Sequence, residues 1–283
     1  MKVVVYLGRV EFRLDGLTSG QREWVEAAWG PFLTPEASLL GDRSHKQHAR
    51  IWTLMFISQS LPSEIDLSFQ RGGDLAIQRI HPERFDDDHR TLNCWIDGSF
   101  GSIEASLQVA LQWALLEQDG LLIHASAGIW RGEGWLIPGP SGAGKSTSAR
   151  TAGFDEVLSD ELVILLPSLS SASDIPFTLF STPFWSEGRT LPLVLRAAPL
   201  TRITFPIKSA SVSLTPCAPI DAITQLVPTL TLYELENSSQ RERVFNIACT
   251  LCESTPSYWL HFTKVGSWLS ELDEANSITK SSL

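Results

Sequence analysis

Residues 135–147 read WLIPGPSGAGKST, and this stretch decides how the middle of the chain folds. The segment from Gly139 to Ser146 matches the pattern G-x-x-x-x-G-K-[ST] in full. The apolar residues just before it predict a short buried strand, and the residues just after it predict a helix. A strand, a glycine-rich loop and a helix in this order form the context in which the pattern binds phosphate.

The composition of this loop predicts a nucleotide site. Glycines let successive backbone N–H groups turn inward around a polyphosphate without interference from Cβ atoms, and the following helix presents its positive end to the same anion. Lys145 would add a charge at the β- and γ-phosphates, and the Ser146 hydroxyl can ligate Mg²⁺. We therefore expect ATP and Mg²⁺ as cofactors, bound through Gly139, Pro140, Ser141, Gly142, Ala143, Gly144, Lys145, Ser146 and Thr147.

An acidic pair, Asp160 and Glu161, begins fifteen residues after Lys145 and lies between two apolar segments that predict strand. A carboxylate at this position can hold the metal ion, directly or through water. In a regular strand the two side chains point to opposite faces, so one of them faces the phosphates unless the strand ends or bulges between them.

The rest of the chain predicts an α/β protein with two domains. Residues 1–100 read as an α+β domain, with a strand at 3–7, a helix that starts at the capping-box pair Thr18 and Gln21, and short strands at 50–59, 65–70 and 75–80. Residues 101–283 begin with an amphipathic helix over 102–117. The further elements predicted there are strands at 121–130, 135–138, 162–166, 177–181, 201–206 and 257–263 and helices at 219–227, 240–252 and 266–275.

Composition excludes several classes of function. The chain has 22 Lys and Arg against 32 Asp and Glu, a formal charge of −10, which argues against binding to nucleic acid because that affinity comes from basic patches. The apolar stretches are too short to cross a bilayer, which needs about 20 apolar residues. The four cysteines are too few and too scattered for a disulfide framework. These features predict a cytoplasmic protein that binds neither nucleic acid nor membrane.

The strand 121–130, the phosphate loop and the Ser159-Asp160-Glu161 segment together resemble the catalytic domain of HPr kinase/phosphorylase and related bacterial serine kinases, whose fold is shared with phosphoenolpyruvate carboxykinase. In that family a histidine precedes the first loop glycine by fifteen residues, and His124 precedes Gly139 by this interval. The resemblance implies a mixed-sheet P-loop kinase core. The remainder of the chain loosely resembles divergent HPr-kinase-like proteins found in bacterial peptide-modification clusters.

The resemblance also implies roles for individual residues. His124 would orient an acidic group or the phosphates, Lys145 would bind the phosphates, and Ser146 with Asp160 would hold the metal ion. The family's second acid, usually Asp, takes the acceptor's proton; Glu161 stands at that position here, so either Glu161 or Asp160 is the expected base. Glu187 is the candidate for a further acid that reaches the metal.

These features predict a phosphotransferase that uses ATP and Mg²⁺ to phosphorylate a hydroxyl of a peptide, protein or small molecule, with serine as the expected acceptor. Residues 1–100 would then serve substrate binding or assembly, including assembly into a homo-oligomer. The alternative is a regulatory module that binds a nucleotide without transferring phosphate. A carboxykinase-like reaction on an organic acid is a third hypothesis.

Overall fold

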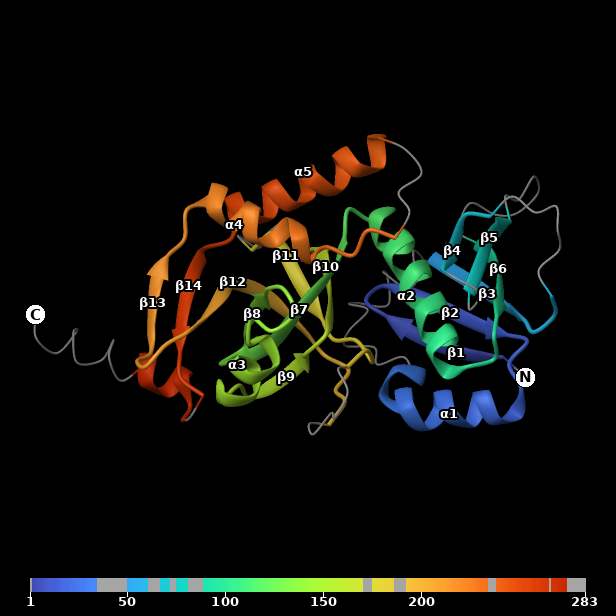
Figure 1. Ribbon diagram of the computed structural model, residues 1–283, viewed down its shortest axis with the longest axis horizontal. Coiled ribbons are helices and arrows are strands. Elements are labelled where there is room, and N and C mark those ends of the chain that lie inside the picture. The colour runs from blue at the N-terminus through green and yellow to red at the C-terminus, as the bar shows by residue number, and fades with distance from the viewer. Residues whose placement is uncertain are drawn as a thin grey trace, which may run out of the picture. The chain divides into compact units, whose positions relative to one another are not determined.

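A computed structural model gives the fold of the chain (Figure 1). It describes residues 2–34, 50–60, 67–71, 75–80, 89–169, 175–185, 192–233, 238–264 and 266–273. Glu187 lies outside the described residues.

The chain forms two compact units that do not coincide with the predicted domains. Unit 1 comprises Met1–Gln118 and Leu232–Arg241, and unit 2 comprises Asp119–Thr231 and Glu242–Leu283. The sequence-based boundary at residue 100 assigned the helix that follows it to the second domain. In the structure this helix, α2 (Phe100–Leu116), packs on strands of the first sheet and belongs to unit 1.

Unit 1 contains a six-stranded mixed sheet in the order β1-β2-β3-β6-β5-β4. Strands β2, β3 and β6 are parallel to one another, and the outer pairings are antiparallel. The bounds are β1 Val3–Leu7, β2 Val10–Asp15, β3 Arg50–Ile57, β4 Phe69–Arg71, β5 Leu75–Ile80 and β6 His89–Ile96. Alternate residues of β1 and β2 are buried, as expected when a sheet covers a core with one face.

Two helices complete unit 1. Helix α1 (Ser19–Trp29) begins at the predicted capping box, in which the Thr18 side chain and the Gln21 side chain each accept a hydrogen bond from the other residue's backbone N–H. The short 3₁₀ helix η1 (Gly30–Leu33) follows it. Helix α2 contacts β3, β5 and β6, and its largely buried surface explains its high content of Leu and Ala.

Unit 2 is built around five strands that close on themselves in the order β11-β10-β7-β8-β12, with β12 also pairing to β11. Strands β8 and β12 are parallel, and the other pairs of the ring are antiparallel. The bounds are β7 Leu121–Trp130, β8 Glu133–Pro138, β10 Leu162–Pro167, β11 Phe177–Phe180 and β12 Ala197–Lys208. The mixed α/β fold class is thereby confirmed as a mixed sheet in one unit and a mixed barrel in the other.

Further elements extend this barrel. Strand β9 (Glu156–Ser159) pairs with β7, and β14 (Ser257–Phe262) pairs with β12 in parallel and with β13 (Ser213–Pro216) in antiparallel. The helices are α3 (Lys145–Thr151), α4 (Pro219–Leu226), η3 (Val227–Thr229) and α5 (Ser238–Ser254), and residues 268–273 are also helical. Among the described residues, no helix combines the length and the hydropathy needed to cross a membrane.

An apolar cluster lies beneath α3 and fixes its position on the sheet. It joins Ala149 of α3 and Ala152, the residue that follows the helix, to residues of β8, β14 and the last helical segment, among them Trp135, Phe262 and Trp268. The indole N–H of Trp268 donates to the carbonyl of Ser148 at 2.7 Å. This packing holds the first turn of α3, and hence the end of the glycine-rich loop, against the barrel.

Candidate functional site

The glycine-rich loop connects β8 directly to α3, as the sequence pattern predicts. Gly142 and Gly144 have φ angles of +78° and +102°, in the left-handed region where a side chain is strained. The N–H of Ala143 donates to the carbonyl of Pro140 at 3.2 Å, which closes a turn inside the loop. The N–H of Ser148 donates to the carbonyl of Gly144 at 2.7 Å and starts the helix.

Gly144 is required by space as well as by backbone conformation. A Cβ atom added there would lie 2.8 Å from Cζ of Phe262, a side chain that is buried in the cluster beneath α3. Any larger residue would therefore push the loop away from β14. The loop is seated closely on the ends of the strands because position 144 has no side chain.

Lys145 is the first residue of α3, and its ammonium group lies against the loop. Nζ donates to the carbonyl of Pro140 at 3.2 Å. Burial lowers the pKa of Lys145, while the charges of Glu161 and Asp160 act in the opposite direction. The lysine therefore lies within the electrostatic reach of both acids.

The acidic pair occupies an interruption in a strand that runs along β7. Ser159 of β9 is opposite Ala127, and Leu162 of β10 is opposite His124, so the register with β7 is the same immediately before and after the acidic pair. Asp160 and Glu161 fall between β9 and β10. A break in the strand at the acidic pair is the alternative that the sequence leaves open, and with it the two side chains need not point to opposite faces.

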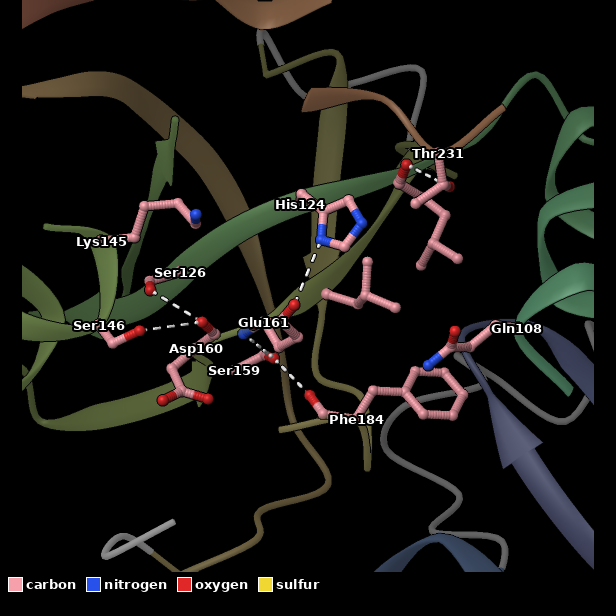
Figure 2. Close-up of polar contacts among 12 residues, drawn as sticks. Gln108, His124, Ser126, Lys145, Ser146, Ser159, Asp160, Glu161, Phe184 and Thr231 are labelled. Atoms are coloured by element: carbon pink, nitrogen blue, oxygen red, sulfur yellow. Dashed lines mark hydrogen bonds and ion pairs between the residues drawn. The ribbon is translucent and has the colours of Figure 1, made fainter. Parts of the chain in front are cut away.

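Hydrogen bonds to the backbone of Asp160 and Glu161 hold this break in the strand in place. The hydroxyls of Ser126 and Ser146 each donate to the carbonyl of Asp160 at 3.4 Å (Figure 2). The N–H of Ala125 donates to the carbonyl of Glu161 at 3.1 Å. The N–H of Glu161 donates to the hydroxyl of Ser159 at 3.2 Å. The segment that carries the acids is thus tied both to β7 and to α3.

Glu161 and His124 come together at this break in the strand. Nδ1 of His124 lies 3.5 Å from Oε1 of Glu161, and Figure 2 shows the carboxylate turned toward the ring. Hydrogen bonding to His124 lowers the pKa of Glu161; burial opposes this, and the charges of His124 and Lys145 lower the pKa further. The side chains are 43% and 39% exposed, so a substrate could reach them from solvent.

Asp160 lies in a different environment from Glu161. The residue is only 4% exposed, and in Figure 2 its carboxylate points away from the imidazole. Its backbone contact with Ser146 brings together two of the three residues predicted to hold a metal ion, whereas the third, Glu187, is among the undescribed residues. Hydroxyl and carboxylate oxygens are the donors that Mg²⁺ prefers, and it commonly takes only one or two protein groups beside substrate phosphates.

The remaining predicted residues can also be placed. Ser141 and Gly142 are exposed at the tip of the loop, Gly139 is buried at its start, and Thr147 is half-buried in the first turn of α3. Within the described ranges, no group of three or more His, Cys, Asp or Glu side chains is arranged to hold a metal ion without other ligands.

A further cation, Lys208, lies beside the loop and was not predicted from the sequence. It is the last residue of β12, and its Nζ donates to the carbonyl of Gly142 at 3.0 Å. No motif marks this lysine, because it follows Lys145 by more than sixty residues. The parallel pairing of β12 with β8 places the end of β12 beside the loop, and this pairing would have to be known in order to predict the position of Lys208.

The comparisons correct the family suggested by the sequence. A family model described as SynChlorMet cassette protein ScmC matches residues 102–277, which is more than half of the chain, and no HPr kinase family model matches. No curated protein matches the chain. The assignment to the HPr kinase/phosphorylase relatives is therefore wrong; it rested on a phosphate loop, a histidine and an acidic pair, and short motifs of this kind recur in unrelated proteins. On the length of the match, the chain belongs to the ScmC family.

Proposed function

We propose that this protein is a phosphotransferase that binds ATP with Mg²⁺ at the loop 139–147 and transfers phosphate to a hydroxyl group. In this proposal, β8, the loop and α3 form the phosphate-binding part of a P-loop kinase core. The single observation that carries the proposal is the acid–imidazole pair Glu161 and His124, held within electrostatic reach of Lys145. A loop that only binds nucleotide does not need such a pair.

In the proposed reaction the hydroxyl oxygen of the acceptor forms a bond to the γ-phosphorus of ATP. The bond from that phosphorus to the bridging oxygen breaks, and ADP leaves with the electron pair. The acceptor's proton passes to a carboxylate. Backbone N–H groups of the loop and the Lys145 ammonium would offset the charge on the transferring group.

Glu161 is the better candidate for the base. Its carboxylate is half-exposed, and its lowered pKa keeps it ionised at neutral pH, so it can accept a proton from an acceptor that arrives from solvent. His124 would hold the carboxylate in position through the contact at 3.5 Å.

Asp160 and Ser146 would hold Mg²⁺. Asp160 is buried beside the first turn of α3, where Ser146 supplies a hydroxyl oxygen. When bound there, Mg²⁺ would neutralise part of the negative charge of the triphosphate. Mg²⁺ commonly keeps oxygen ligands from the phosphates, so these two protein groups suffice to place it.

The test is transfer of labelled γ-phosphate to an acceptor. Because the family is described as a cassette protein, the acceptor panel should begin with the proteins and peptides encoded beside this gene. We expect label on a hydroxyl-bearing residue of one of them, found by mass spectrometry, and no label with the Lys145→Ala variant. Nucleotide binding by the wild type without transfer to any acceptor would instead favour the regulatory module.

A further inference from the structure

Three parallel strands of unit 2 end at the edge from which the glycine-rich loop departs. Strand β8 ends at Pro138 and leads into the loop, β12 ends at Lys208, and β14 ends at Phe262. Ligands of α/β proteins bind beyond the carboxyl ends of parallel strands, where loops and strand-end side chains meet. The last residues of β12 and β14 are thus placed next to any ligand of the loop.

The register of these strands directs Lys208 toward the loop. Lys208 is opposite Phe262 in the β12–β14 pair, and paired residues project to the same face of a sheet. Phe262 packs beneath Gly144, and Cε of Lys208 lies 3.5 Å from the position that a Cβ on Gly144 would take. The lysine therefore lies on the face of the sheet that carries the loop, not on the opposite face.

The ammonium groups of Lys208 and Lys145 make the same kind of contact. Nζ of Lys208 donates to the carbonyl of Gly142 at 3.0 Å, and Nζ of Lys145 donates to the carbonyl of Pro140 at 3.2 Å. Each cation thus rests on a neutral acceptor of the same loop. A phosphate oxygen is a stronger partner for an ammonium group than a carbonyl, because a charge-assisted hydrogen bond is roughly twice as strong as a neutral one.

We infer that Lys208 is a second cation that binds the polyphosphate of the nucleotide, alongside Lys145. This inference rests on the proposed function, since it assumes that the loop holds a nucleotide. On binding, Nζ exchanges the Gly142 carbonyl for a phosphate oxygen. Lys208 then contributes most to the affinity for a nucleoside triphosphate and least to that for a monophosphate, because its partner is phosphate charge.

The experiment measures the affinity of the full chain for ATP, ADP and AMP in the presence of Mg²⁺ by titration calorimetry. We expect Lys208→Ala to weaken ATP binding about tenfold or more, as for loss of a hydrogen bond between charged groups, and to affect AMP least. Lys208→Arg should retain most of the affinity. Lys2→Ala, which removes an exposed lysine of unit 1, is the control and should bind like the wild type.

A second variant separates charge from a purely structural role. Lys208→Gln keeps a long side chain with an N–H donor for the Gly142 carbonyl, but it has no charge. If charge matters, this variant binds ATP as weakly as Lys208→Ala, and raising the salt concentration weakens the wild type more than either variant. If Lys208→Gln binds ATP like the wild type, the lysine only supports the loop and the inference is overturned.

The outcomes also separate this inference from the proposed function. Wild-type protein that binds no nucleoside triphosphate would contradict the proposed function itself. Wild-type protein that binds ATP, together with a folded Lys208→Ala variant of equal affinity, would overturn only the role of Lys208. Circular dichroism melting of each variant shows whether it is folded.

Discussion

Oε1 of Glu161 lies 3.5 Å from Nδ1 of His124, and the register of two strands brings them together. Glu161 directly precedes Leu162, whose partner on β7 is His124. The carboxylate and the imidazole are therefore positioned by the sheet and not by a long loop. Groups that must act together at fixed distance are held more precisely on strands than on loops.

The first prediction separates the two acids. Glu161→Gln should lower kcat by about 10²–10⁴-fold, the usual contribution of a positioned base, and leave ATP affinity nearly unchanged. Asp160→Asn should weaken ATP binding in the presence of Mg²⁺, because it removes the charge of a metal ligand. Both effects are read from initial rates and from titration of each variant with ATP.

The control for this pair is Glu242→Gln, which removes an exposed carboxylate from α5 and should match the wild type in both measurements. Loss of ATP affinity in Glu161→Gln with unchanged kcat would reverse the two assignments, making Glu161 the metal ligand. Full activity in both variants would remove the acidic pair from the mechanism.

The second prediction concerns pH. Hydrogen bonding to His124 is the main reason that the pKa of Glu161 lies below its ordinary value, and burial alone would raise it. In His124→Leu the hydrogen bond to the imidazole is absent, so the pKa of Glu161 should rise. A base acts only when ionised; the acid limb of kcat/KM should therefore move to higher pH in the variant.

The same contact also affects stability. Because the folded-state pKa of Glu161 is lowered, its contribution to stability is present at neutral pH and is lost as the pH falls through that pKa. We expect a smaller acid-induced loss of stability for His124→Leu than for the wild type. Superimposable pH profiles of rate and stability would show that the imidazole has no influence on the carboxylate.

The local motifs could be predicted because each one lies within a few consecutive residues of the sequence. The match from Gly139 to Ser146 and the capping box at Thr18 specify a backbone conformation directly, and both formed as expected. The break between β9 and β10 was anticipated as an alternative, because two acids between apolar segments suit a strand end.

Long-range pairing was not predictable in the same way. The strands β2, β6 and β13 were missed, and β12 was predicted shorter than it is. The role of the helix α2 in unit 1 depends on strands β3, β5 and β6, which no local pattern connects to it. Lys208 reaches the loop only through the parallel pairing of β12 with β8, a relationship that one sequence does not encode locally.

The third prediction concerns Gly144. Gly144→Ala places a Cβ at φ +102° and 2.8 Å from Cζ of Phe262. The backbone conformation alone should cost about 1–3 kcal/mol, and the contact with the ring adds to it. We expect a lower melting temperature and weaker ATP binding, because the loop must move away from β14.

A double-mutant cycle with Phe262→Leu separates these two costs. The smaller side chain should relieve the contact but not the backbone strain, so part of the stability lost in Gly144→Ala should return in the double variant relative to Phe262→Leu alone. Additive effects of the two substitutions would show that the ring does not limit position 144. Gly20→Ala is a suitable control, since a Cβ there meets no atom within 4 Å.

The fourth prediction concerns the support of α3. The Trp268 indole is fully buried between Trp135 and Phe154, with ring centroids 5.7 and 5.8 Å away, and its N–H donates to the Ser148 carbonyl at 2.7 Å. Trp268→Phe removes this donor and leaves unfilled volume, which together should lower the free energy of unfolding by roughly 1–3 kcal/mol. Urea unfolding measures the loss, and hydrogen exchange should become faster in α3 before it does in unit 1.

The control is Trp130→Phe, at a half-buried ring on the same cluster, which should lower the free energy of unfolding by less. If the two variants lose equal stability and exchange in α3 is unchanged, the hydrogen bond to Ser148 does not anchor the helix, and the loop must be held by the sheet alone.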